Sequence, residues 1–165
     1  MNERSTRILE IGMASYSSYH LCRAARKGHQ KEVEEILKLH PDIIDCPYKY
    51  GETPLHIAVC WGHISIVELL IHAGARLDTT TEYGSRPLHN AAAAGNKSMV
   101  KLLLQSGSQF LDSPDKDGKT PLHYAAENGH KSIVCILLQF GSQSLDSPDK
   151  NGKTPSQYTA TLKQL

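Results

Sequence analysis

The apolar positions of residues 51–83 fall into two short groups that a glycine separates. Thr53 can cap a helix with its hydroxyl, and Pro54 suits the first helical position, where a missing N–H costs nothing. The pattern therefore predicts a short helix from Pro54 through about Trp61. Gly62 can end that helix in a left-handed conformation at little cost.

A second apolar group follows directly after this turn. We expect a second helix from about Ile64 to His72, which carries five apolar side chains: Ile66, Val67, Leu69, Leu70 and Ile71. Gly74 stops this helix, and the stretch ARLDTTTEY leads as a loop into Gly84. The predicted unit is therefore helix, turn, helix and loop. The segments KEVEEILKL, KSMVKLLLQ and KSIVCILLQ predict the second helix of three other units.

The same arrangement recurs along most of the chain. Four prolines, each with a glycine three positions before it, are separated by 33, 34 and 34 residues: Pro54, Pro87, Pro121 and Pro155. Around them stand the segments GETPLHIA, GSRPLHNA, GKTPLHYA and GKTPSQYT, and an earlier copy begins at LCRAARKGH. This spacing predicts a repeat architecture from about residue 20 to the end.

Each predicted helix pair is too short to be stable alone, because isolated helices below ~12–15 residues are marginal in water. The apolar face of one pair must therefore be covered by the next, which makes a quasi-linear solenoid. Small side chains on the first helices let these helices approach closely: Ala58, Ala91, Ala92, Ala125 and Ala126.

These residues resemble the ankyrin repeat, whose G-x-TPLH-x-A…GH…V-x-LL…G pattern is strong in the second, third and fourth copies. The resemblance implies an all-α ankyrin-repeat solenoid of stacked helix-turn-helix units with protruding hairpin-like loops. The first copy has YHLC in place of TPLH and is similar to an N-terminal cap. The fifth ends after one expected helix, so it is either a C-terminal cap or a repeat that a longer native chain would complete.

The expected organisation follows from these boundaries. It comprises a partly flexible lead-in at 1–19, repeats at 20–50, 51–83, 84–117 and 118–151, and a partial repeat or cap at 152–165.

Charge and composition narrow the classes of partner. The net charge of +1 is small for a protein that binds nucleic acid by phosphate attraction. No apolar run approaches the ~20 residues that span a bilayer. The four cysteines form no CxxC pair, and we interpret them as free thiols in a reducing compartment. We therefore expect a monomer in the cytoplasm or also the nucleus, with no membrane and no nucleic acid as partner.

The chain offers little support for catalysis or cofactors. Residues 107–121 and 141–155 differ at only two of fifteen positions, whereas an active site needs distinct residues at distinct places. No HExxH or GxSxG motif is present. The two GKT segments lack the preceding glycine of a P-loop, and the aspartates before Gly118 lack the glutamate that closes a calcium loop. We predict a non-enzyme that holds no cofactor and no metal.

The nine histidines have a structural interpretation. His56, His89 and His123 share one repeat position, and His29, His63 and His130 share another, about one repeat apart and too far to ligate one ion. The ankyrin resemblance implies that both sets make hydrogen bonds to the backbone. Two Ser-Pro pairs, at Ser113 and Ser147, fit either turns, which we favour, or phosphorylation by a proline-directed kinase.

The ankyrin resemblance also implies where a partner binds: at the loop tips before each TPLH and at the exposed ends of the first helices. On this chain the predicted protein-binding residues are Arg26, Lys27, Lys49, Tyr50, Glu52, Trp61, Glu82, Tyr83, Ala93, Ala94, Lys116, Asp117, Lys119, Glu127 and Asn128. Lys150, Asn151, Lys153, Ser85 and Cys60 occupy equivalent positions.

Trp61 is the expected apolar anchor of this surface, with Tyr50 and Tyr83 beside it; a core tryptophan is the alternative. We expect the groove to be centred on the second and third repeats, where Ala93 and Ala94 leave room for a partner side chain. A partner with an acidic side chain near an apolar one would fit.

The predicted function is a non-enzymatic protein-interaction module, an adaptor, scaffold or inhibitor, that binds a protein on its concave face. One alternative is the substrate-recognition part of a larger enzyme or ubiquitin-ligase subunit. Another is a nucleic-acid or small-ligand binder, against which the charge weighs.

Overall fold

The computed structural model describes residues 17–162, and this part of the chain is built from short helices without strands. The α-helices are α2 (Ser18–Lys27), α3 (Gln30–Leu39), α4 (Pro54–Cys60), α5 (Ile64–His72), α6 (Pro87–Ala94), α7 (Lys97–Ser106), α8 (Pro121–Glu127), α9 (Lys131–Gln139) and α10 (Pro155–Leu162). Four 3-10 turns lie between them: η1 (Pro41–Ile43), η2 (Lys49–Gly51), η3 (Ser108–Phe110) and η4 (Ser144–Asp146).

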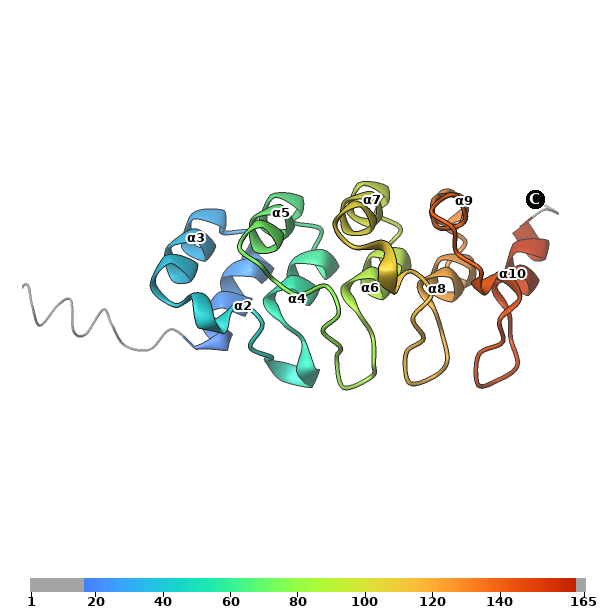
Figure 1. Cartoon of the computed structure of the whole chain (residues 1–165), viewed down its shortest axis with the longest axis horizontal. Helices are drawn as coiled ribbons and strands as arrows, with labels where there is room; N and C mark the ends of the chain where they lie inside the picture. Colours follow the sequence, from blue (N-terminus) through green and yellow to red (C-terminus); the bar gives the residue numbers. More distant parts are fainter. Residues whose placement is uncertain (1–16, 163–165) are drawn as a thin grey trace, which may run out of the picture.

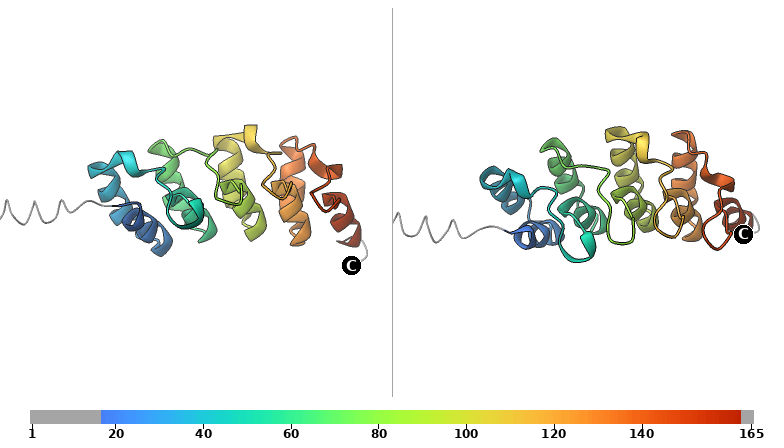
Figure 2. Two further views of the ribbon diagram at one scale, coloured as in Figure 1. Left: turned by 90° about the horizontal axis from the view of Figure 1, so that it is seen from below. Right: turned by 60° about the horizontal axis from the view of Figure 1, so that its bottom comes forward.

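The helices stack in two rows. The first helices of the units, α2, α4, α6, α8 and α10, pack side by side in chain order, and the second helices, α3, α5, α7 and α9, form the other row (Figure 1). The connecting loops project together on the side of the first helices that faces away from the second row (Figure 1, Figure 2). The predicted all-α solenoid of stacked helix-turn-helix units is confirmed.

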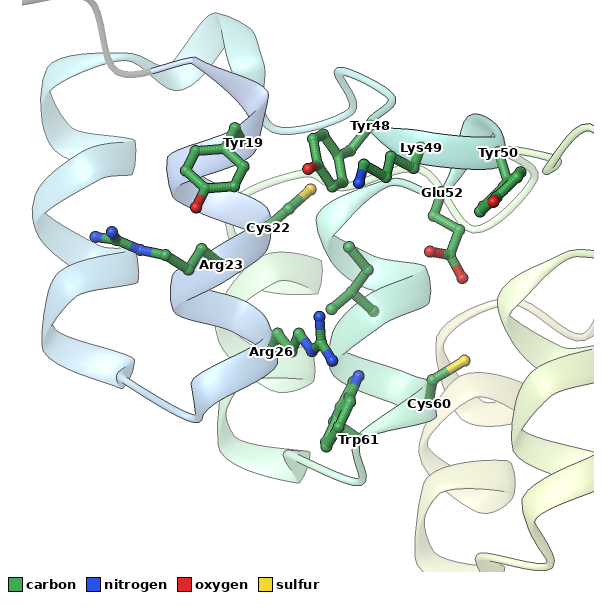
Figure 3. Close-up of a pocket in the computed structure, with 11 residues that line it drawn as sticks. Tyr19, Cys22, Arg23, Arg26, Tyr48, Lys49, Tyr50, Glu52, Cys60 and Trp61 are labelled. Carbon is green, nitrogen blue, oxygen red and sulfur yellow. The ribbon is translucent and has the colours of Figure 1, made fainter.

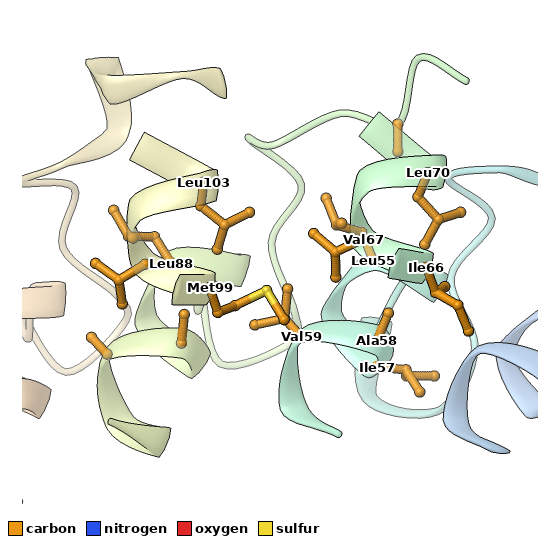
Figure 4. Close-up of a cluster of buried hydrophobic side chains, with 14 of the residues drawn as sticks. Leu55, Ile57, Ala58, Val59, Ile66, Val67, Leu70, Leu88, Met99 and Leu103 are labelled. Atoms are coloured by element: carbon orange, nitrogen blue, oxygen red, sulfur yellow. The ribbon is translucent and has the colours of Figure 1, made fainter. Parts of the chain in front are cut away.

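The core is continuous along the stack. In the second unit, Leu55 and Val59 from α4 and Ile66 from α5 are buried, and Met99 from α7 packs against the neighbouring unit (Figure 4). The five alanines expected on the first helices are all buried, as predicted. Their small side chains let adjacent first helices approach closely, while the larger aliphatic residues fill the space between the two rows.

Capping residues and prolines start the first helices. Thr53 is the N-cap of α4, Thr120 is the N-cap of α8, and a proline occupies the next position in each. In α4 the backbone N–H of Thr53 donates to Nδ1 of His56 at 3.3 Å, which completes a capping box. Gly28 ends α2 with a φ of 75°, in the left-handed region that glycine adopts at little cost.

The first helix of the first unit differs from the others. Ser17 caps α2, which begins at Ser18, whereas Pro54 of α4 lies 34 residues after His20. Relative to the repeat, α2 is therefore two residues longer at its start. Residues 1–16 of the expected lead-in lie outside the described residues, as do 163–165.

One set of histidines joins each unit to the next. Nε2 of His56 lies 3.1 Å from the carbonyl oxygen of Ser85, and Nε2 of His89 lies 3.2 Å from that of Lys119. Because Nδ1 of His56 accepts from Thr53, the hydrogen-bond network assigns a neutral ring with the proton on Nε2. The predicted backbone contacts are confirmed for these two residues.

The second set joins each unit to the one before it. Nε2 of His63 lies 3.0 Å from the carbonyl oxygen of Arg26, and Nε2 of His130 lies 3.0 Å from that of Ala93. These contacts hold the end of each first helix against the following unit. The backbone contacts are confirmed here too.

His29 departs from this expectation, and His123 meets it at only one of its two ring nitrogens. His29 pairs with the side chain of Glu32, with 3.0 Å between Nδ1 and Oε2. His29 belongs to the first unit, and residues 17–162 contain no preceding first helix whose end it could contact. His123 keeps its contact with Thr120, but its buried Nε2 has no hydrogen-bond partner in the described part of the chain.

The projecting loops end in four tips, which we call fingers: residues 48–52, 81–85, 115–119 and 149–153. Each finger closes on itself through a backbone hydrogen bond, such as that from the N–H of Thr81 to the carbonyl of Ser85 at 3.0 Å. Neighbouring fingers are also bonded: the N–H of Lys116 donates to the carbonyl of Tyr83 at 3.0 Å. Equivalent bonds join the first to the second finger and the third to the fourth.

Other expectations concern membranes and thiols. Within residues 17–162 no helix is long and apolar enough to cross a membrane. All four cysteines are unpaired: Cys22 is buried, Cys46 is half-buried, and Cys60 and Cys135 are exposed. The interpretation of the cysteines as free thiols agrees with the structure.

Candidate functional site

A hollow of about 350 Å³ opens between α2, α4 and the first finger (Figure 3). It lies on the face formed by the first helices and the fingers. Its lining consists of Tyr19, Cys22, Arg23, Arg26, Tyr48, Lys49, Tyr50, Glu52, Ile57, Cys60 and Trp61. The volume falls at the small end of the range of about 300–1,000 Å³ that is typical of ligand pockets.

Trp61 stands at the rim of this hollow, at the end of α4. Its side chain is 55% exposed, so the alternative of a core tryptophan is wrong and the predicted surface position is confirmed. The guanidinium of Arg26 lies 4.8 Å from the centre of the Trp61 ring, in a cation–π contact. The two side chains come from adjacent first helices and meet at the lower edge of the hollow (Figure 3).

The fingers add two more exposed rings. Tyr50 is 58% exposed and Tyr83 is 63% exposed, and their ring centres lie 6.3 Å apart. Tyr50 adopts a φ of 57°, and it is the one residue other than glycine with a positive φ in residues 17–162. Such a conformation costs a bulky side chain about 1–2 kcal/mol, and strain of this kind often marks a functional position.

Five lining residues were not among the sequence-predicted positions: Tyr19, Cys22, Arg23, Tyr48 and Ile57. Tyr19 and Tyr48 lie with ring centres 5.6 Å apart, and Arg23 is paired with Glu32 at 3.1 Å. One feature of the sequence marks the position of the hollow. The first copy has YHLC instead of TPLH, so Cys22 stands where the later repeats carry a buried histidine.

Five predicted binding residues come together in the hollow: Arg26, Lys49, Tyr50, Glu52 and Trp61. Burial raises the pKa of the half-buried Glu52 carboxyl, while the positive charge of Arg26 acts in the opposite direction. The hollow thus lies between the first and second repeats, one repeat nearer the N-terminus than the expected centre of the groove.

The other predicted positions continue along the face. Lys27, Glu82, Ala94, Lys116, Asp117 and Asn128 are exposed, and Ala93 is half-buried. In the fourth repeat Nζ of Lys119 lies 2.6 Å from Glu127, and this contact raises the pKa of the lysine. The mixed charge expected at this end is therefore partly neutralised within the chain.

A family model described as ankyrin repeats, in three copies, matches residues 9–81 and 74–149. The chain belongs to the ankyrin-repeat family. No curated protein matches it. Ankyrin repeats are generally modules that bind other proteins and are typically non-enzymatic, which agrees with the coarse function predicted from the sequence.

The two Ser-Pro pairs lie on the loops of this ankyrin stack and differ in exposure. Ser147 is exposed, whereas Ser113 is half-buried. The backbone N–H of each donates to a carbonyl three residues earlier, at 3.2 Å in both cases, which is a turn contact. The turn interpretation is confirmed, and phosphorylation stays a hypothesis.

Proposed function

We propose that the chain is a non-enzymatic interaction module, an adaptor, scaffold or inhibitor, that binds one protein partner across the concave face of its first helices and fingers. The observation that carries this proposal is the hollow with exposed aromatic side chains at its rim. Aromatic residues bury a large area with little loss of rotamer freedom, and they are enriched among the residues that dominate binding energy.

Polar residues of the same face surround the hollow and its aromatic rim. Exposed charged side chains on the second and third fingers, such as Glu82 and Lys116, flank the aromatic region. An apolar centre with a polar border is the usual composition of a specific interface. The exposed thiols of Cys60 and Cys135 support a place in the cytoplasm or nucleus, and we propose a monomer.

Affinity capture from a cell extract tests the proposed face. The full chain is compared with a variant in which Trp61, Tyr50 and Tyr83 are all alanine. As a matched control, three exposed residues of the second helices (Lys31, Glu68 and Lys101) are replaced by alanine. We expect proteins that the wild type and the control retain but the aromatic variant loses. Equal retention by all three would contradict binding on this face.

The single replacement of Trp61 is expected to weaken the binding of a partner identified in this way. Trp61→Ala should weaken binding by about 2 kcal/mol, close to a 30-fold rise in Kd, because it removes the largest exposed ring at the hollow. Titration calorimetry with the purified partner measures the change. An unchanged Kd, with the variant folded by circular dichroism, would remove Trp61 from the site.

A further inference from the structure

The first repeat departs from the others at a position that lines the hollow. In the second and third repeats the buried rings of His56 and His89 occupy the space between a first helix and the next finger, and each bonds to that finger. Cys22 holds the equivalent position in α2, 34 residues before His56. A thiol is smaller than an imidazole, so space remains between α2 and the first finger.

The walls of this space are apolar and aromatic. Cys22 and Ile57 are buried lining residues. Tyr19, Tyr48 and Trp61 stand around the hollow (Figure 3). The two extra residues at the start of α2 place Tyr19 over the opening, where its ring meets Tyr48. The volume suits one or two side chains of a peptide and is too small to accept a folded element.

The charges around the hollow favour an anionic occupant. Arg23 is already paired with Glu32. Arg26 and Lys49 then face a single lining carboxylate, that of Glu52, so the remaining lining charge is positive. Aromatic cages that bind methylated or quaternary ammonium groups need a lining without excess positive charge. In this hollow the Trp61 ring is already in a cation–π contact with Arg26.

Arg26 is also held in place for binding. Its carbonyl oxygen accepts from Nε2 of His63 at 3.0 Å, and its guanidinium lies over the Trp61 ring, 4.8 Å from the ring centre. The guanidinium is planar, and its in-plane N–H groups can donate to the two oxygens of a carboxylate while the group keeps its contact with the ring. Less freedom is then lost when a ligand binds.

We propose that the hollow is a specificity pocket for an extended acidic peptide segment of the partner. An apolar side chain enters between Tyr19, Tyr48 and Trp61, and a carboxylate one or two residues away is bound by Arg26 with support from Lys49. This inference depends on the proposed function, because it names the chemistry of the partner at the same face.

Selection from a random dodecapeptide library displayed on phage tests the inference with the full 165-residue chain. We expect enrichment of sequences with Asp or Glu within two residues of Leu, Ile, Phe or Met. A synthetic peptide of the enriched sequence, and its Asn or Gln counterpart, are then titrated by fluorescence anisotropy. The amide peptide should bind at least about tenfold more weakly, since it cannot form charge-assisted hydrogen bonds with Arg26.

Two variants locate the binding. Cys22→His restores the residue of the other repeats and should fill the hollow, and Arg26→Glu reverses the charge at its rim. Each should weaken the acidic peptide at least about tenfold. Lys38→Glu is the control, because Lys38 is an exposed cation in the last turn of α3, in the other row, and the net charge changes equally. Circular dichroism checks the folding of Cys22→His, and Arg26→Glu, a surface change, tests the pocket independently.

Other outcomes overturn the inference. Enrichment of basic peptides, peptides that bind Cys22→His and Arg26→Glu as tightly as wild type, or the absence of any enriched peptide would each exclude an acidic-peptide pocket. The capture experiment above separates this failure from failure of the proposed function. If a partner is retained by the wild type and the control but lost with the triple aromatic variant, the proposed binding face is supported even when the acidic-peptide pocket is excluded.

Discussion

Replacement of Gly84 by alanine is expected to lower the free energy of unfolding by about 3 kcal/mol. Gly84 has a φ of 79°, which costs alanine roughly 1–2 kcal/mol. A Cβ at this position would lie 2.8 Å from the backbone nitrogen of Lys116, the atom that bonds to the carbonyl of Tyr83 in the preceding finger. The backbone must shift, which weakens a hydrogen bond worth about 1 kcal/mol.

Gly152 provides a matched control within the same chain. It holds the same repeat position with a φ of 75°, but a Cβ there would meet nothing within 4 Å. Gly152→Ala should therefore carry only the conformational cost of about 1–2 kcal/mol. The midpoints of urea unfolding, followed by circular dichroism, measure both variants. Equal losses would contradict the expected clash between a Cβ at position 84 and the backbone of Lys116.

The second large effect is a loss of stability in acid caused by His56. Burial lowers the pKa of His56 to about 4 in the folded chain, from an ordinary value of 6.5. Between these two pH values the unfolded chain binds more protons than the folded chain, so stability is complete above pH 6.5 and falls as the pH falls toward 4. We expect a loss of about 2 kcal/mol at pH 5 relative to pH 7.5 from this residue.

The structure explains why the charged form is disfavoured and suggests the variant to test. Nδ1 of His56 accepts from the N–H of Thr53, and Nε2 donates to Ser85, so the buried ring is satisfied only when neutral. Gln157 holds the equivalent position in the fifth unit, where its Oε1 accepts from the N–H of Thr154 at 3.3 Å. His56→Gln therefore keeps an acceptor and removes the titrating group.

Urea unfolding of the wild type and of His56→Gln at pH 7.5 and pH 5 measures the effect. The variant should lose about 2 kcal/mol less than the wild type between the two conditions. The same replacement at the exposed His72 is the control for a histidine-to-glutamine change outside the core. An identical loss in wild type and His56→Gln would contradict the assignment.

The sequence determined the repeat and its helices. Thr53, Pro54 and Gly62 act on the backbone within a few residues of their own positions, so helix bounds could be read locally and agree with α4 and α5. The buried alanines followed from the periodic pattern for the same reason. The exposure of Trp61 was predictable as well, because Ala58 already filled the inward position of that turn.

Only the tertiary structure decided where the face becomes a pocket. Tyr19 and Tyr48 lie far from Trp61 in the sequence, and their approach depends on how α2, α4 and the first finger pack. The substitution at Cys22 was visible in the sequence, but a missing ring leaves a hollow only if neighbouring helices do not close over it. The periodic pattern of the sequence describes the features that all repeats share. The hollow depends on residues at which one repeat differs from the others. Side-chain volume and the packing of segments distant in sequence determine whether such a difference leaves a pocket.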